Sequence, residues 1–196
     1  MKYYLKLSVI PFLYLFFQSS ISIAIFGIKS QVFGLILLAL NALIFVFTIC
    51  VFSFKNGESA YKVLLLNDAE RRIIVETGTD RPINVKEEYS PFKGAILGIF
   101  PLIPLLVLML VHLIIYLCGS DYSGIGAICV FLYKMPFAFF EYLGYKITST
   151  TCFLTLLSVP VVFFPIYISY NMGARRARLM HEKFEEQKKY LHGENK

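Results

Sequence analysis

Long apolar runs without a charged side chain recur four times along this chain of 196 residues. They cover residues 7–28, 30–54, 94–120 and 147–174. An α-helix needs about 20 apolar residues to cross a hydrocarbon layer about 30 Å thick, and each run reaches that length. The pattern therefore predicts an all-α fold, a polytopic helical membrane bundle with four transmembrane helices.

The composition agrees with a membrane protein. Hydrophobic residues make up 57% of the chain and charged residues 16%, against about 45–50% and about 25% in soluble domains. The N-terminal stretch resembles a secretory signal, but its apolar part exceeds the usual length of about 7–15 residues and no clear cleavage site follows. We interpret it as a retained first span, so that residues 1–54 form a transmembrane hairpin.

The basic residues predict the orientation of the chain. Seven Lys and Arg residues lie in the connection 55–93 and seven follow Met172, whereas the connections at Lys29 and at 118–123 carry one and none. By the positive-inside rule, the connection, the tail 175–196 and the N-terminus face the cytoplasm. The chain is then a multi-pass protein of the cell inner (cytoplasmic) membrane with an even number of crossings.

A fifth apolar stretch, residues 122–145, contains Lys134, Pro136 and Glu141. Each charge placed at the centre of a span costs about 2.5–3.5 kcal/mol on insertion scales. We therefore predict a re-entrant or interfacial element on the outer side; a fifth span with an external tail is the alternative. Pro136 disfavours helix at the residue before it, so we expect a break between Lys134 and Glu141. This outer charged pair is either a solvated face or the mouth of an ion pathway.

Three polar residues within the runs are candidate functional groups. Gln18 and Asn41 either bond across a helix interface or line a substrate path, because lipid offers them no partner. His112 is either a neutral ring bonded to a neighbouring carbonyl or a titratable site. Pro101 and Pro104 remove two backbone donors from the third run, which predicts a kink and carbonyls that another group must satisfy.

The connection 55–93 is long enough to hold structure of its own. Tyr61, Leu64, Leu65 and Asp68 follow helical spacing, which predicts a short amphipathic helix at the membrane surface. The β-branched residues within 72–76 predict an extended piece, followed by a turn at 77–80. Acidic and basic residues balance in this connection, which argues against a nucleic-acid partner.

The tail 175–196 continues the fourth run without a helix breaker. Its residues Met180, Phe184, Gln187 and Leu191 recur at intervals of three and four, as on one face of a helix. One role for this basic amphipathic helix is to hold Arg175, Arg176 and Arg178 at anionic inner-leaflet lipids. The other role is to dock a protein partner on its apolar face.

No residue pattern of a catalytic, metal or cofactor site occurs. The four spans contain one His and no Asp or Glu, whereas an enzyme needs a nucleophile or a metal with an acid or base close by. The four cysteines form no CxxC pair. Three of them, Cys118, Cys129 and Cys152, are expected toward the outer face, where they either pack in the apolar interior or form a disulfide.

Residues 89–104, YSPFKGAILGIFPLIP, join a charged connection through a Lys-Gly step to a span that contains prolines. This segment resembles uncharacterised polytopic membrane proteins of low-GC Gram-positive bacteria. The resemblance implies a bacterial inner-membrane setting and no particular chemistry.

These observations predict four segments: the hairpin 1–54, the cytoplasmic connection 55–93, spans three and four within 94–174 with the outer element 122–145, and the amphipathic tail 175–196. The function predicted first is that of a non-catalytic subunit or regulator acting through membrane partners, with a protein partner or homo-oligomer open. The alternative is a small transporter or channel that uses the kinked third and fourth spans. A membrane-embedded enzyme is disfavoured.

Overall fold

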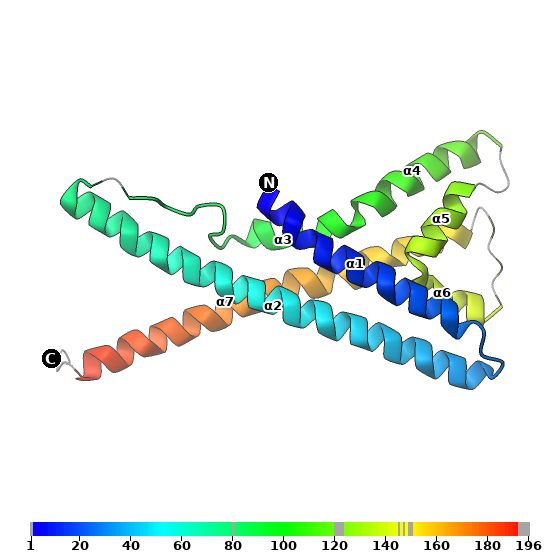
Figure 1. Cartoon of the computed structure of the whole chain (residues 1–196), viewed down its shortest axis with the longest axis horizontal. Helices are drawn as coiled ribbons and strands as arrows, with labels where there is room; N and C mark the ends of the chain where they lie inside the picture. The colour runs from blue at the N-terminus through cyan, green and yellow to red at the C-terminus, as the bar shows by residue number, and fades with distance from the viewer. Residues whose placement is uncertain are drawn as a thin grey trace. The chain divides into compact units, whose positions relative to one another are not determined.

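The computed structural model describes residues 2–79, 81–119, 124–144, 146, 148 and 151–191, and every regular element within this part of the chain is a helix (Figure 1). Four of the described helical segments are long and apolar enough to cross a membrane: Lys6–Ile25, Gln31–Thr77, Pro91–Leu117 and Thr151–Leu191. The prediction of an all-α fold with four candidate spans is therefore confirmed.

The chain divides into two compact units. The first comprises Met1–Ile49 and Ile96–Pro165, and the second comprises Cys50–Ala95 and Ile166–Lys196. The long helices α2 (Gln31–Thr77) and α7 (Ser158–Leu191) contribute to both units.

In the first unit, α1 (Lys2–Ile25) and the start of α2 form a helical hairpin. The turn between them is closed by backbone bonds from Gly27 to Ala24 and from Ile28 to Ile25. Buried Ile25 and Leu38 form a small apolar core there with Ala138 of α6 (Lys134–Tyr142). The hairpin is the arrangement expected for two apolar runs separated by a short turn.

The third apolar run is broken where its prolines predict a kink. It consists of α3 (Pro91–Ile99), the 3₁₀ turn η1 (Phe100–Leu102) and α4 (Ile103–Leu117). Within the 3₁₀ turn, Ile103 N donates to the Phe100 carbonyl. The corresponding bond to the Pro101 carbonyl cannot form, because Pro104 has no N–H. Instead the buried Tyr133 hydroxyl donates to the Pro101 carbonyl at 3.0 Å.

Two short helices, α5 (Gly124–Leu132) and α6, meet at Tyr133 and form a V (Figure 1). At nine residues each, they are about 13 Å long at 1.5 Å per residue. The tip of the V reaches the Pro101 carbonyl through Tyr133. The end of α6 returns to the α1–α2 turn, where the Tyr142 hydroxyl donates to the Ile28 carbonyl at 2.8 Å.

The expected break between Lys134 and Glu141 is wrong. The helix breaks one residue earlier, at Tyr133, and both charged residues belong to α6. Pro136 then lies in the first turn of α6, where a missing N–H removes no intrahelical bond. Pro136 therefore lies just after the break at Tyr133 and causes no second break between Lys134 and Glu141.

In the second unit, α2 continues well past the end of its apolar run. The predicted extended piece at 72–76 is wrong, because these residues form the last turns of α2. The predicted turn does begin directly after the helix: Gly78 has a φ of +67° and donates its N–H to the Ile74 carbonyl. Glycine adopts this left-handed conformation without steric cost, which makes it a common residue after a helix end.

The second unit is held together by a close crossing of α2 and α7. A Cβ atom built on Gly173 would lie 2.8 Å from the carbonyl carbon of Phe54, and one built on Gly57 would lie 2.7 Å from that of Tyr170. These glycines therefore bring the two backbones into direct contact. The spacing of small buried residues supports the crossing, with Ser53 four residues before Gly57 and Ala177 four residues after Gly173.

Candidate docking groove

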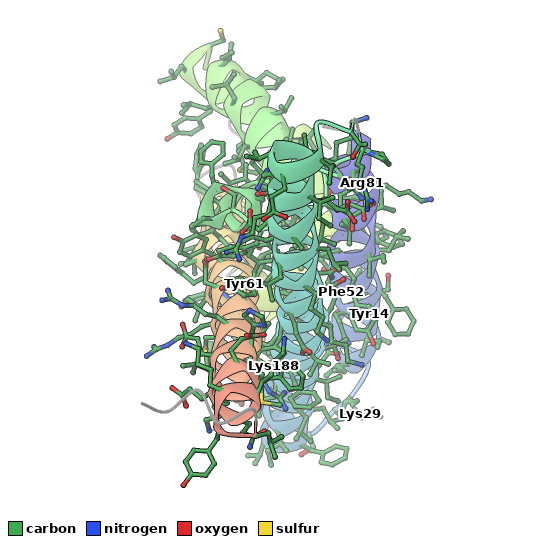
Figure 2. All side chains as sticks on the ribbon, turned by 90° about the vertical axis from the view of Figure 1, so that its left-hand side faces the viewer. Tyr14, Lys29, Phe52, Tyr61, Arg81 and Lys188 are labelled. Carbon is green, nitrogen blue, oxygen red and sulfur yellow. The ribbon has the colours of Figure 1, made fainter. Side chains whose placement is uncertain are left out.

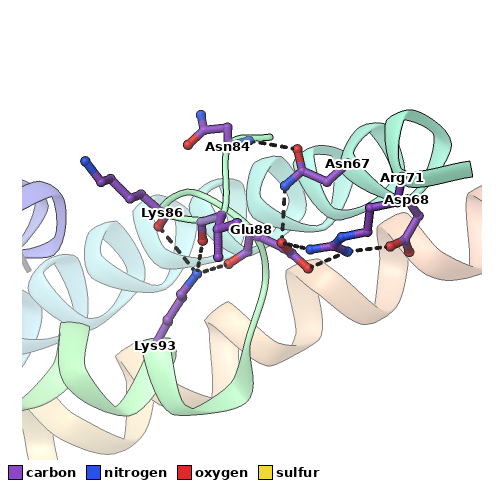
Figure 3. Close-up of polar contacts among 8 residues, drawn as sticks. Asn67, Asp68, Arg71, Asn84, Lys86, Glu88 and Lys93 are labelled. Carbon is purple, nitrogen blue, oxygen red and sulfur yellow. Dashed lines mark hydrogen bonds and ion pairs between the residues drawn. The ribbon is translucent and has the colours of Figure 1, made fainter. Parts of the chain in front are cut away.

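One face of the second half of α2 is covered by the connector, defined here as residues 81–90. Tyr89 N donates to the Ala60 carbonyl at 3.0 Å. Asn84 N donates to Asn67 Oδ1 at 3.1 Å, and Asn67 Nδ2 donates to Glu88 Oε2 at 3.2 Å. Asn67 therefore ties two points of the connector to the helix (Figure 3).

An ion pair reinforces this cover. The Arg71 guanidinium donates to both carboxylate oxygens of Glu88, at 2.8 and 3.2 Å, and to Asp68 at 2.7 Å (Figure 3). The hydrogen bond from Arg71 lowers the pKa of Glu88 below its ordinary value of 4.5, although partial burial acts in the opposite direction. Glu88 is therefore anionic at neutral pH and remains an acceptor for Arg71.

Lys93, at the start of α3, holds the far end of the connector. Its ammonium donates to the carbonyls of Glu88 at 2.6 Å and Val85 at 2.9 Å. Nearby, Tyr89 stacks on Tyr170 of α7 with ring centroids 5.7 Å apart, and its hydroxyl donates to Asn171 at 2.9 Å. These contacts make the connector a fixed part of the second unit.

The opposite side of the α2–α7 crossing is open. Figure 1 shows the two helices diverging toward their C-terminal ends beyond the crossing. A groove of about 300 Å³ lies between them, lined by Glu58, Lys62 and Leu65 of α2 and by Arg176, Ala177, Met180, His181 and Phe184 of α7. Its base is apolar and its rim is charged.

Three charged side chains of the rim already have partners. Lys62 pairs with Glu58 at 2.8 Å on α2. The Arg176 guanidinium of α7 lies 5.7 Å from the centre of the Phe54 ring of α2, and beside the groove Arg178 pairs with Glu182 at 2.7 Å on α7. The walls are thus shaped by short-range pairs, and the apolar base is left for an occupant.

The apolar base of the groove continues along α7 as a stripe with intervals of four and three residues. We define this stripe as Gly173, Ala177, Met180, Phe184, Gln187 and Leu191. Gly173 and Ala177 are buried at the crossing, whereas Met180, Phe184 and Leu191 are 61%, 62% and 84% exposed. Figure 2, which views the second unit from its helix ends, shows side chains projecting on all sides of the last turns of α7, Lys188 among them. One continuous stripe is therefore packed in its first part and uncovered in its second.

Two of the predicted intramembrane residues lie together, in the first unit. Asn41 Nδ2 donates to the Gln18 carbonyl at 2.9 Å and to Ser22 Oγ at 3.0 Å, and all three residues are buried. These bonds join α2 to α1, as expected of a helix-packing contact. The side-chain oxygen of Gln18 and the hydroxyl of Ser19 are buried without a hydrogen-bond partner.

His112 lies elsewhere in the first unit. It is fully buried on α4, with its ring centroid 5.2 Å from that of Phe153 in η2 (Thr151–Leu157). The outer charged pair lies on α6, where Glu141 is half-buried and the Lys134 side chain falls outside the described part. The structure therefore joins Gln18 with Asn41 and places His112 against Phe153.

The cysteines and the acidic residues form no combined site in the described part of the chain. Cys118 is an exposed free thiol and Cys152 a buried one, while the Cys129 side chain falls outside the described residues. Among the described side chains, no three His, Cys, Asp or Glu groups are arranged to hold a metal ion.

The sequence pattern predicted the apolar face of the tail, but the groove depends on a contact that sequence reasoning missed. Gly57 and Gly173 are 116 positions apart, and only their spacing to other small residues signals a close crossing. Comparisons with models of protein families, with curated proteins and with solved structures find no match. The groove is therefore interpreted from its own geometry.

Proposed function

We propose that this chain is a non-catalytic component of a bacterial cytoplasmic membrane, a subunit or regulator that acts through a protein partner. The observation that supports this function best is the groove between α2 and α7 together with the uncovered stripe on α7. A wedge between two diverging helices with apolar side chains at intervals of three and four has the form of a helix-in-groove docking site.

The position of the groove favours a cytoplasmic partner. Three apolar runs are bounded on this side by a basic residue, namely Lys55, Lys93 or Arg175. Residues at these boundaries lie at the helix crossing: Gly94 packs against Tyr170, and Gly173 packs against Phe54. Three independent charge boundaries therefore meet at one level of the second unit. By the positive-inside rule this level is the cytoplasmic surface, where Arg175, Arg176 and Arg178 would contact anionic lipid headgroups.

The V formed by α5 and α6 suits a re-entrant element on the outer side. Each arm is too short to cross a layer about 30 Å thick, and the tip contacts Pro101, which lies seven residues into the apolar run that starts at Gly94. Irregular backbone at membrane depth requires burial in protein, and Tyr133 at the tip is fully buried. This arrangement keeps an even number of crossings and both ends in the cytoplasm.

Site-specific photocrosslinking in growing cells tests the proposed function. We expect a photoreactive amino acid in place of Phe184 to give a defined crosslinked product, because this side chain lies uncovered in the groove. The same group at Glu186, on the opposite side of α7, is the matched control and should give no such product. Replacing Met180 by serine should reduce the crosslink from position 184. Equal products from both positions would mean that the groove is not a docking site.

A small transporter is the second candidate, favoured by the unpartnered oxygens of Gln18 and Ser19 on α1, the helix that packs against the 3₁₀ turn of the broken third run. Discontinuous helices with buried polar groups are typical of transport sites. Purified protein in liposomes should then carry an ion or small solute, and Gln18→Leu should abolish the flux. Flux equal to that of protein-free liposomes for every solute tested would reject this candidate.

A further inference from the structure

No acidic residue flanks the stripe on α7, and the flanking residues with a full charge are an arginine and two lysines. In a heptad numbering with Ala177, Phe184 and Leu191 at position a, the stripe occupies a and d. The flanking e and g positions then hold Arg176, His181, Lys183, Lys188 and Tyr190. Its acidic residues Glu182, Glu185 and Glu186 take the outer positions f, b and c. An uncovered apolar stripe is therefore bordered on both sides by basic groups.

The proposed function requires an occupant for this groove, and we infer that the occupant is an amphipathic helix of another protein with apolar a and d residues bordered by Asp and Glu. Flanking e and g charges set the choice of partner in helix pairing. Acidic flanks would meet Arg176, Lys183 and Lys188 across the interface. The inference thus names the chemistry of the partner for the same site.

A second copy of this chain fits the stripe poorly. Two copies inserted in the same direction bring their α7 tails together in parallel, where each g position faces the next e position of the other helix. Lys183 would then face Lys188. Like charges opposite one another are destabilising, so the flanks disfavour self-association through this stripe.

A membrane surface also fits poorly. Helix α7 is unbroken from Ile166 to Leu191, so the tail cannot turn to lie flat on the bilayer. With the membrane boundary at Arg175, Lys188 lies about 20 Å beyond it along the helix axis, and about 15 Å even at a tilt of 40°. Charges interact with the surface only within a Debye length of about 8–10 Å. Lipid therefore explains Arg175, Arg176 and Arg178 but not Lys188.

Binding of two synthetic helices to the full-length protein tests this inference. Both peptides contain about three heptads with leucine at a and d; one has glutamate at e and g, and its twin has lysine. The protein is held in nanodiscs of neutral phosphatidylcholine, and fluorescence anisotropy is followed up to about 1 mM peptide. We expect the acidic peptide to bind at least tenfold more tightly than the basic one.

Adjacent lysines provide a matched pair of variants. Lys188→Glu reverses a flanking charge and should weaken the acidic peptide about tenfold, because one attractive pair becomes repulsive. Lys189→Glu makes the same charge change at an outer position and should alter binding less than twofold. The double variant Lys183→Glu with Lys188→Glu should bind the basic peptide more tightly than the acidic one.

Several results would overturn the acidic-partner inference. The first is that the acidic and basic peptides bind equally, or that neither binds. The second is that Lys188→Glu and Lys189→Glu change binding equally. The third is that replacing phosphatidylcholine by phosphatidylglycerol in the nanodiscs is enough to block binding of the acidic peptide. A dimer in nanodiscs that Phe184→Ser dissociates would assign the stripe to a second copy. If position 184 gives a crosslink but the two peptides bind equally, the acidic-partner inference is rejected and the proposed function is retained. If position 184 gives no crosslink, the proposed function itself is rejected.

Discussion

Replacing Gly173 by alanine tests the helix crossing on which the groove depends. The added Cβ would overlap the Phe54 carbonyl oxygen and would lie 2.8 Å from the carbonyl carbon, whereas ordinary contact begins at 3.4 Å. The neighbouring atoms are backbone and cannot rotate away, so α2 and α7 must separate by more than the roughly 0.6 Å that the carbon alone requires. A gap of 0.5–1 Å forfeits roughly a quarter to a half of the dispersion energy of each facing contact.

We expect Gly173→Ala to lower the free energy of unfolding by about 1–2 kcal/mol. Overpacking costs about 1–3 kcal/mol, and the higher helix propensity of alanine returns up to about 1 kcal/mol. Gly57→Ala should act similarly, because its Cβ would meet the Tyr170 backbone from the other helix. Once one substitution has separated the helices, the second costs less, so the double variant should lose less than the sum of the two.

Reversible unfolding in mixed detergent micelles, followed by circular dichroism, measures these changes. Gly124→Ala is the matched control, because no atom lies within 4 Å of a Cβ built there, and its unfolding free energy should stay within about 0.5 kcal/mol of the wild type. The reasoning fails if Gly173→Ala is as stable as this control, or if the two crossing substitutions are strictly additive.

Three further predictions concern the connector, the V and the topology. Because Arg71 lowers the pKa of Glu88 in the folded state, this ion pair should contribute fully to stability well above pH 4.5, and the contribution should be lost as the pH falls below that value. Glu88→Gln should therefore make the loss of stability between about pH 5 and pH 3 smaller in unfolding titrations. Tyr133→Phe leaves the Pro101 carbonyl without its hydroxyl donor and should cost about 0.6–2 kcal/mol in detergent unfolding, whereas Tyr190→Phe should cost nothing measurable. Exposed Cys118 should react with an impermeant maleimide on intact cells, and a label that appears only after permeabilisation would contradict the orientation.

The candidate spans could be predicted from sequence because apolar length is a local property. Each of the four runs contributes to one helical segment, and the boundaries differ by a few residues where the run ends in a turn, as at Ile25 and Leu117. The kink at Pro101 was predictable for the same reason, since a missing N–H acts within one turn. The group that satisfies the freed carbonyl, Tyr133, lies 32 residues away and carries no local signal.

Local sequence preferences gave a wrong prediction for residues 73–75, where tertiary contacts determine the secondary structure. Ile73, Ile74 and Val75 favour a strand by their β-branched side chains, yet they continue α2. The part of α2 just before these residues is fixed to the connector through Asn67 and Arg71. Because a helix that is already formed extends at low cost, residues 73–75 continue it. Arg71 and Glu88 are 17 residues apart, so the sequence shows that both are charged but does not predict that they pair.

The uncovered part of the stripe also constrains where its partner is held. Fully burying Met, Phe or Leu contributes about 1.5–3 kcal/mol each, and Met180, Phe184 and Leu191 have 61–84% of their surface left to bury. The three side chains together therefore supply roughly 3–6 kcal/mol, while association from solution costs at least about 4 kcal/mol in lost translation and rotation. Flanking ion pairs at an exposed interface add only about 0.2–1 kcal/mol each. A freely diffusing partner would bind weakly, but one anchored in the same membrane meets the groove at an effective concentration in the millimolar range. We therefore expect the acidic helix to belong to a membrane-anchored protein, and tethering the acidic peptide to the nanodisc by a lipid chain should saturate the groove at a much lower total concentration than the free peptide requires.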